Sequence, residues 1–165
     1  MDDYIEKIEL NLFELIKDIK NPSILEFGVQ NGESTTRFLD LCNKNNGYLY
    51  SVDIDDCSKV SDDKRWKFIK TRDDNFDIVK FQIPKEFDVI FIDSLHEANH
   101  VEKIFYNYYD HLKIGGYLFI DDISHLPYLD KKKTSFYCEI NNKETFEMLL
   151  SIFYFNQNCF DINFS

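Results

Sequence analysis

Residues 23–34 read SILEFGVQNGES, and this stretch decides the fold. It carries one acid, Glu26, within a short apolar run, followed by two glycines four residues apart, Gly28 and Gly32. The pattern predicts a buried strand, a tight turn and a helix that begins at Glu33. A helix N-terminus beside a glycine turn presents backbone N–H groups, so the stretch indicates a site for a nucleotide-like ligand.

Segments of strand character alternate with segments of helical character along the chain. Apolar runs predict strands over 24–29, 48–54, 66–71, 86–93, 117–122 and 159–164. Helices are expected over 2–20, 33–45, 75–81, 97–112 and 142–155, a short one within 55–65, and a glycine turn at 114–116. The last helix should bury Phe146, Leu149, Leu150 and Phe153. This alternation predicts an α/β fold, a doubly wound and mostly parallel sheet in three layers, α/β/α.

Composition limits the classes of function. The chain has 165 residues, 44% of them hydrophobic, which suits one domain over residues 1–165. A net charge of -11 repels phosphate backbones and anionic membranes, so neither nucleic acid nor membrane is an expected partner. The N-terminus carries no visible signal peptide, and the four cysteines form no C-x-x-C pair, which predicts reduced thiols in a cytoplasmic protein.

Acidic residues end every predicted strand except the last. In a parallel sheet these ends meet at one edge, where ligands bind. One such acid is a common helix cap, but capping alone does not explain acids at five exits. Asp53 lies about twenty residues beyond the glycine turn, where a carboxylate accepts two ribose hydroxyls. Asp73 or Asp74 is placed to accept from an adenine amino group, and we favour Asp73. The stretch lacks the middle glycine of G-x-G-x-x-G, which argues against a nicotinamide-dependent oxidoreductase.

Four motifs, in order, carry a family resemblance. They are EFGVQNGEST (26–35), SVDI (51–54), FDVIFIDSLH (87–96) and LKIGGYLFIDD (112–122). Together they resemble class I S-adenosylmethionine-dependent methyltransferases over residues 24–124. Within that class they resemble the small metal-dependent O-methyltransferases, nearest the macrocin-type and cephalosporin hydroxylase-like branch. The fold implied is Rossmann-like, and this chain is short for it, with a shortened C-terminal part.

The resemblance assigns roles at the cofactor and at a metal. It implies that S-adenosylmethionine is held by Glu26, Gly28, Gly32, Asp53, Asp73 and Asp93. It also implies that Asp93, Asp121 and Asp122 hold a divalent metal, most simply Mg²⁺, which prefers hard oxygen ligands. A hydroxyl bound to such a metal has a lowered pKa and can attack the sulfonium methyl group.

Four histidines have different expected roles. His96 follows Asp93 by three residues, a position that in the resembling enzymes often supplies the general base, and imidazole titrates near neutral pH. The alternative is a histidine at a helix entry with no chemical role. His125 is a candidate for a substrate contact, whereas His100 and His111 are expected to be surface or packing residues.

The expected activity is therefore methyl transfer to a hydroxyl of a small molecule, a sugar or vicinal diol. Residues 124–140 are the candidate substrate cover, and a homodimer that completes the pocket is also open. A non-catalytic S-adenosylmethionine-binding module of the same fold is the main alternative. Residues 96–100, HEANH, also match the zinc-peptidase pattern H-E-x-x-H. That pattern needs both histidines on one helix and a third ligand downstream, which no motif supplies.

Overall fold

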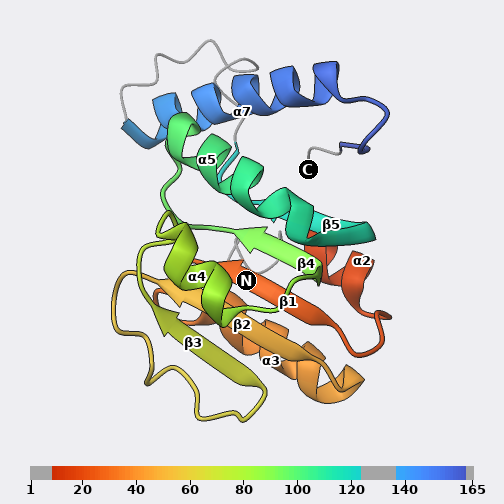
Figure 1. The fold of residues 1–165 in the computed structure, drawn as a ribbon, viewed down its shortest axis with the longest axis vertical. Coiled ribbons are helices and arrows are strands. Elements are labelled where there is room, and N and C mark those ends of the chain that lie inside the picture. The colour runs from red at the N-terminus through yellow and green to blue at the C-terminus, as the bar shows by residue number, and fades with distance from the viewer. Residues whose placement is uncertain (1–8, 124–136, 163–165) are drawn as a thin grey trace.

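The computed structural model of the chain describes residues 9–123 and 137–162 (Figure 1). Within them a five-stranded sheet has the order β3-β2-β1-β4-β5, and every neighbouring pair is parallel. The strands are β1 (Ser23–Phe27), β2 (Tyr48–Asp53), β3 (Trp66–Lys70), β4 (Phe87–Ile92) and β5 (Leu112–Ile120). The order reverses beside β1, so the carboxyl ends of β1 and β4 flank the switch point, where open α/β sheets bind ligands.

Helices cover both faces of the sheet (Figure 1). One face carries η1 (Glu9–Phe13), α2 (Glu14–Ile16) and α3 (Glu33–Asn45), and the other carries α4 (Phe76–Gln82) and α5 (Ala98–Tyr108). A 3₁₀ turn, η2 (Tyr109–His111), follows α5, and α7 (Tyr137–Phe155) packs against α5 beyond the β5 edge. The predicted α/β fold in three layers is therefore confirmed.

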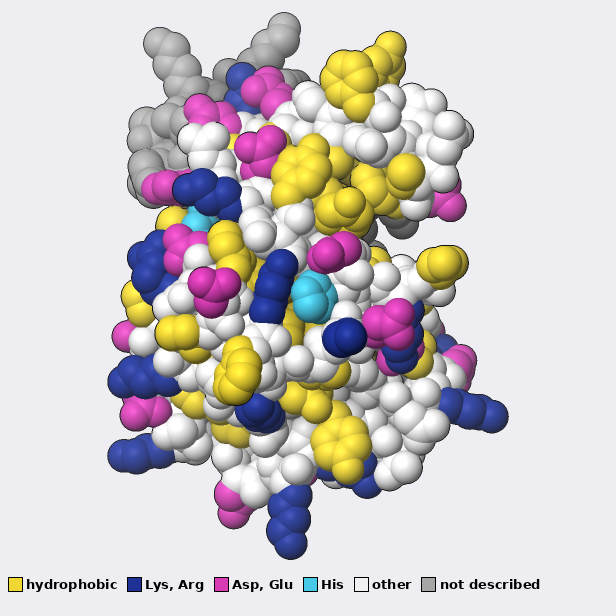
Figure 2. Space-filling model, in the orientation of Figure 1, with side chains coloured by type: hydrophobic (Ala, Val, Ile, Leu, Met, Phe, Trp, Pro, Cys, Tyr) yellow, Lys and Arg dark blue, Asp and Glu magenta, His cyan; other side chains and the backbone are white. Residues whose placement is uncertain are grey.

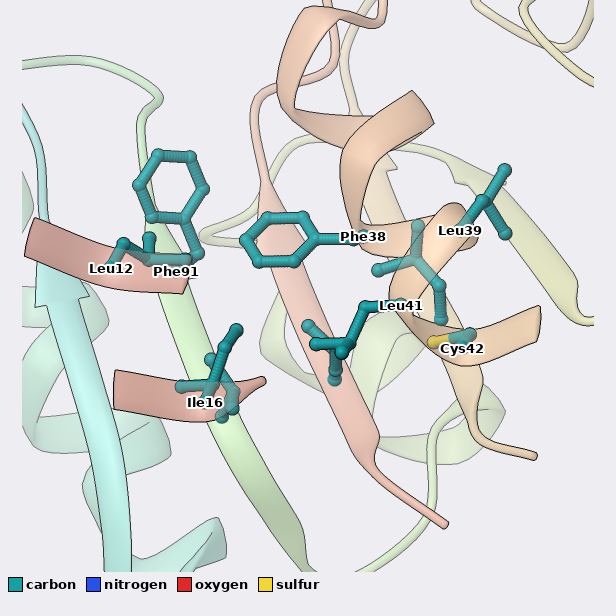
Figure 3. Close-up of a cluster of buried hydrophobic side chains, with 10 residues drawn as sticks. Leu12, Ile16, Phe38, Leu39, Leu41, Cys42 and Phe91 are labelled. Atoms are coloured by element: carbon teal, nitrogen blue, oxygen red, sulfur yellow. The ribbon is translucent and has the colours of Figure 1, made fainter. Parts of the chain in front are cut away.

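Two of the three hydrophobic clusters in the described residues lie on the sheet, one on each side, and the third lies between α5 and α7. Successive side chains of a strand point to opposite faces, so Ile24 joins one cluster and Leu25 the other. In the first cluster Leu12, Ile16 and Phe38 lie over the sheet near Phe91 (Figure 3), and the Phe38 and Phe91 ring centroids are 5.5 Å apart. The central strands β1 and β4 are thus buried on both faces, as their near-continuous apolar sequence predicts.

The chain departs from the predicted elements around β5 and within 55–65. β5 begins at Leu112, which pairs with Phe87, and the next pair is Val89 with Tyr117, so residues 113–116 form a bulge inside the strand. The predicted turn at 114–116 is therefore wrong. The predicted short helix within 55–65 is also wrong, because side chains of Asp53, Asp56 and Asp63 accept from amides two residues ahead and stabilise turns instead.

The C-terminal segment also differs from expectation. α7 begins at Tyr137, and its described buried side is Thr145, Leu149 and Ile152, whereas Leu150 is 39% exposed. No strand forms over 159–162, the part of the predicted terminal strand that the structure describes. Phe160 instead packs its ring 5.9 Å from Phe105 on α5. Residues 1–8 of the first predicted helix and the predicted contact His125 lie outside the described residues.

Exposed aromatic side chains lie on α5 and α7. Hydrophobic side chains gather over these two helices in Figure 2, and the exposed ones include Tyr106, Tyr154 and Phe155, with Tyr109 of η2 directly after α5. No helix in the described ranges combines the length and the apolarity needed to cross a bilayer. The structure holds a single chain, so the homodimer stays a prediction.

Candidate functional site

A cleft of about 530 Å³ lies at the carboxyl ends of the strands. This volume falls within the roughly 300–1,000 Å³ typical of small-molecule sites. Segments that follow all five strands line it, contributing Gly28 to Asn31, Glu33, Ser34, Val52 to Ile54, Arg72, Asp73, Asp93 to His96, His100, Asp121 and Asp122. The cleft therefore brings together seven of the predicted site residues: Gly28, Asp53, Asp73, Asp93, His96, Asp121 and Asp122. Glu26 and Gly32 are not among its lining residues.

Backbone hydrogen bonds hold the strand exits in register beyond the strands themselves. The amide of Gly28 donates to Val52 O (2.9 Å), that of Asp93 to Phe27 O (2.8 Å), and that of Asp121 to Ile92 O (2.9 Å). These hydrogen bonds fix the backbone directly after three neighbouring strands. The side chains of Asp93 and Asp121 therefore project from a rigidly held backbone.

The two glycines allow close backbone approach. Gly28 has φ +93°, and a Cβ there would lie 1.9 Å from the carbonyl oxygen of Asp93. Gly32 has φ +82°, and a Cβ there would lie 2.2 Å from Val60 Cγ1. Both positions favour glycine by conformation and by space. Gly28 faces the cleft, whereas Gly32 caps α3 and lies against Val60.

Glu26 lies behind the turn and is fully buried. Its Oε1 accepts from Ser34 Oγ (2.6 Å), and its Oε2 accepts from Thr35 Oγ1 (2.8 Å) and Ser51 Oγ (2.6 Å). Burial raises the pKa of Glu26 to about 7, although the three hydroxyls partly offset this. The carboxyl group joins β1, β2 and the first turn of α3, and its predicted contact with a cofactor stays a prediction.

Asp53 ends β2 and faces the glycine turn. Its Oδ2 accepts from the amides of Val29 (2.7 Å) and Gln30 (3.1 Å), and its Oδ1 accepts from the amide of Asp55 (2.9 Å). Burial alone would raise the pKa of Asp53, but these amides and the Cys57 thiol outweigh burial and lower that pKa. A carboxylate offers about four lone-pair sites, so ribose hydroxyls at Asp53 would compete with the turn's own amides.

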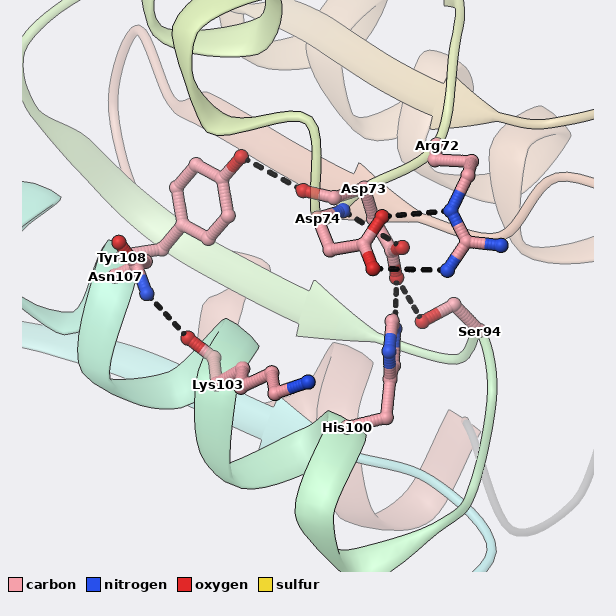
Figure 4. A network of polar contacts seen from close by, with 8 residues as sticks. All are labelled: Arg72, Asp73, Asp74, Ser94, His100, Lys103, Asn107 and Tyr108. Carbon is pink, nitrogen blue, oxygen red and sulfur yellow. Dashed lines mark hydrogen bonds and ion pairs between the residues drawn. The ribbon is translucent and has the colours of Figure 1, made fainter.

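Asp73, at the exit of β3, is the centre of a partly buried polar network (Figure 4). Its Oδ2 contacts both Ser94 Oγ (2.5 Å) and His100 Nε2 (2.8 Å), and its backbone oxygen accepts from Tyr108 Oη (3.0 Å). Burial raises the pKa of Asp73, but His100 and Ser94 outweigh it and hold that pKa below 3.8. An ionised carboxylate only accepts, so His100 Nε2 donates here.

His100 is therefore more than the surface or packing residue that the sequence predicts. It is buried and pairs with Asp73 across 27 residues of sequence. The only local signal was its position four residues after His96 at the start of a helix. β3 and β4 are not neighbours in the sheet, so strand order alone does not bring Asp73 and His100 together. The helices that follow these strands, α4 and α5, pack on the same face of the sheet, and this packing brings Asp73 and His100 together.

His96 lies among carboxylates in the loop between β4 and α5. Its Nε2 is 3.7 Å from Asp93 Oδ1 and 3.5 Å from Asp122 Oδ2. Asp122 has φ +53°, a left-handed conformation that turns the chain directly after β5. α5 begins at Ala98, so His96 and His100 do not share a helix, and they face different carboxylates. This geometry argues against a zinc peptidase.

The predicted metal ligands fit a cation by chemistry but not by arrangement. Carboxylate oxygens are the donors that Mg²⁺ prefers, and Asp93, Asp121 and Asp122 all line the cleft. Across the described part of the chain, however, no three His, Cys, Asp or Glu side chains are arranged to hold a metal ion. The imidazole of His96 lies between two of the carboxylates instead.

The strand order and the cleft at the strand ends define a Rossmann-like methyltransferase fold. The profile of a family described as a methyltransferase domain matches residues 25–123, and the chain belongs to this family. The resemblance to class I methyltransferases that the motifs indicate is therefore confirmed. A search of curated proteins found no match.

Solved structures share the fold. The MycE methyltransferase of the mycinamycin biosynthetic pathway, in complex with Mg and SAH, is 25% identical over 67% of this chain, with a TM-score of 0.55. A putative caffeoyl-CoA O-methyltransferase from Staphylococcus aureus is 17% identical, with 99% of this chain and 78% of that chain covered and a TM-score of 0.69. The SAH-bound methyltransferase PaMTH1 of Podospora anserina is 15% identical, with 86% and 67% covered and a TM-score of 0.68. This chain spans 32% of MycE in the first match and 41% in a second crystal form.

Proposed function

We propose that this protein transfers the methyl group of S-adenosylmethionine to a hydroxyl of a small molecule, a sugar or vicinal diol. The observation that carries the proposal is the cleft in which the glycine turn, Asp53 and the pair Asp93 and His96 meet at the switch point of the sheet. Membership of the methyltransferase-domain family and the SAH-bound structures of the same fold support the choice of cofactor.

The charge of the cleft supports a cationic cofactor. Its described lining holds six carboxyl groups: Glu33, Asp53, Asp73, Asp93, Asp121 and Asp122. Arg72 also lines it, but pairs with Asp74 at 2.7 Å and 2.8 Å. A cleft lined mainly by one sign of charge concentrates ligands of the other sign, so it favours a sulfonium.

The chemistry proposed for the site is a single displacement. The acceptor oxygen forms a bond to the methyl carbon while the carbon–sulfur bond breaks, its electron pair stays on sulfur, and S-adenosylhomocysteine leaves. The acceptor's proton passes to His96, whose imidazole the carboxylates of Asp93 and Asp122 stabilise once it is charged. Holding both reactants in line supplies most of the acceleration.

The direct test measures binding and turnover of the intact chain. We expect calorimetry to show one S-adenosylhomocysteine per chain, and labelled S-adenosylmethionine to methylate a catechol or a neutral glycoside. Binding without transfer to any diol of a broad panel would favour the non-catalytic module. Absence of binding would overturn the proposed function.

Replacing Asp53 with asparagine should weaken S-adenosylhomocysteine binding by roughly ten- to hundredfold. A hydrogen bond to a charged group contributes about 1.5–3 kcal/mol, and the neutral amide loses that charge. Because Asp53 also accepts from the turn, the amide resonances of Val29 and Gln30 should shift during a titration of the parent. Calorimetry gives the affinity and NMR the shifts.

Asp56→Asn is the matched control for Asp53→Asn. Asp56 lies in the loop directly after Asp53, but it bonds to Ser58 and is not among the residues that line the cleft. We expect its variant to bind S-adenosylhomocysteine like the parent. Equal affinities for parent, Asp53→Asn and Asp56→Asn would remove Asp53 from the cofactor site.

We also propose that Asp93, Asp121 and Asp122 hold a divalent cation after their side chains rearrange around it, because in the described residues they are not arranged as a metal site. When bound, the cation would lower the pKa of an acceptor hydroxyl. An Asp93→Asn, Asp121→Asn double variant should then lose Mg²⁺ binding measured by calorimetry, because two anionic ligands become neutral. The exposed pair Asp55→Asn, Asp56→Asn is the control and should leave binding intact. Metal affinity equal to that of the parent in the first variant would show that the cation binds elsewhere or not at all.

A further inference from the structure

Thr145 connects α7 to the backbone of His96. Its hydroxyl donates to the carbonyl oxygen of His96 at 2.9 Å, across 49 residues of sequence. Thr145 is 1% exposed and lies on the same side of α7 as Leu149 and Ile152, which pack against Phe105 of α5. A polar group at this buried seam is costly unless it is hydrogen-bonded, so the bond to His96 satisfies the hydroxyl.

The loop that carries His96 is held at several points along its length. The backbone amide of its first residue, Asp93, donates a hydrogen bond to Phe27 O and so fixes that residue. Ser94 is fixed by Asp73, which His100 also contacts (Figure 4). The carbonyl group of His96 is then held by Thr145, two residues before α5 begins. The attachment from α7 thus acts on the residue whose imidazole approaches Asp93 and Asp122.

We propose that Thr145 is a positioning residue for His96. By holding the His96 carbonyl, it sets the backbone from which the imidazole reaches the space between the two carboxylates. α7 therefore helps to shape the part of the cleft around His96, although none of its described residues is among those that line the cleft. This inference rests on the proposed function for the role of His96 as base, but the geometry it describes can be measured without turnover.

The first test follows the imidazole resonances of the full-length chain by NMR, with S-adenosylhomocysteine present. Thr145→Val keeps the shape and removes the donor, so we expect the His96 ring signals to move. The His100 ring, held by Asp73, should keep its signals and serves as an internal reference. Thr145→Ser retains the donor and should restore the His96 signals of the parent.

Ser151→Ala is the matched control on the same helix. Ser151 is exposed, and its hydroxyl bonds within α7 to Glu147 O at 3.0 Å. Its loss should leave the His96 signals unchanged. The proposal is overturned if Thr145→Val keeps the His96 ring signals of the parent. It is also overturned if Thr145→Val moves the His100 signals as much as those of His96.

Kinetics with catechol as acceptor give a second readout. A misplaced group near the reacting atoms costs on the order of ten- to hundredfold in rate, so Thr145→Val should lose kcat by about that factor. Its affinity for S-adenosylhomocysteine should stay that of the parent, and Thr145→Ser should recover most of kcat. A parent that binds S-adenosylhomocysteine without methyl transfer would count against the proposed function alone, because the NMR result decides the positioning role independently.

Discussion

Replacing Gly28 with alanine should destabilise the protein by about 3 kcal/mol or more and abolish binding of S-adenosylhomocysteine. The new Cβ would lie 1.9 Å from Asp93 O and 2.7 Å from its carbonyl carbon, and both are backbone atoms. They cannot retreat easily, because the Asp93 amide is bonded to Phe27 O. Overpacking costs about 1–3 kcal/mol and the left-handed conformation a further 1–2 kcal/mol. Urea denaturation measures the first effect and calorimetry the second.

Gly115→Ala is the control that separates conformation from space. Gly115 also has a positive φ, +80°, but nothing lies within 4 Å of a Cβ built there. It should cost only the conformational part, about 1 kcal/mol, and leave cofactor binding unchanged. Equal losses at the two positions would show that the approach of Gly28 to Asp93 is not the constraint.

The sequence was sufficient to predict the sheet and the location of the cleft. Apolar runs mark buried strands, and the β-then-α alternation requires parallel strands whose ends meet at one edge. Asp53, Asp73, Asp93 and Asp121 could therefore be placed together without a structure. The bulge after Leu112 could not be predicted, because glycines also mark turns. Only the pairing of Phe87 with Leu112 and of Val89 with Tyr117 distinguishes a bulge from a turn.

The partners of the polar side chains were harder to predict. Asp53 accepts from the turn's amides, Asp73 pairs with His100, and Thr145 reaches His96. Each pairing depends on how elements far apart in sequence pack, and hydrophobic periodicity carries no information about that. Glu26 is the clearest case, since a carboxyl two residues before a glycine suggests a ligand contact. The sequence did not show that Ser34, Thr35 and Ser51 all donate to this carboxyl group, and the predicted ligand contact stays a prediction.

The stability of the protein should fall by about 3 kcal/mol as the pH rises from about 4.5 to about 7 because of Glu26. Its pKa is raised from the usual 4.5 to about 7 in the fold, where burial disfavours the charged form. Between these values the folded state keeps the proton and the unfolded state releases it. The stabilisation is thus fully present below pH 4.5 and is lost as the pH rises through 7, at about 1.4 kcal/mol per unit.

Asp53 and Asp73 act in a separate window. Their pKa values are lowered from 3.8, so the stability that they contribute is present above that pH and is lost as the pH falls further. A fall in stability between pH 5 and 7 therefore cannot come from them. It can be assigned to Glu26 by comparing the parent with Glu26→Gln.

Glu26→Gln keeps the shape and removes the titration. The three hydroxyls can donate to its oxygen or rotate to accept from its amide nitrogen, so the variant should fold. The difference in unfolding free energy between parent and variant, measured by urea denaturation from pH 5 to pH 8, should change by roughly 3 kcal/mol. Glu33→Gln alters an exposed acid and should follow the parent. Parallel profiles for parent and Glu26→Gln would mean that the three hydroxyls hold Glu26 as a carboxylate at neutral pH. Hydrogen bonding, rather than burial, would then govern the charge behind the glycine turn.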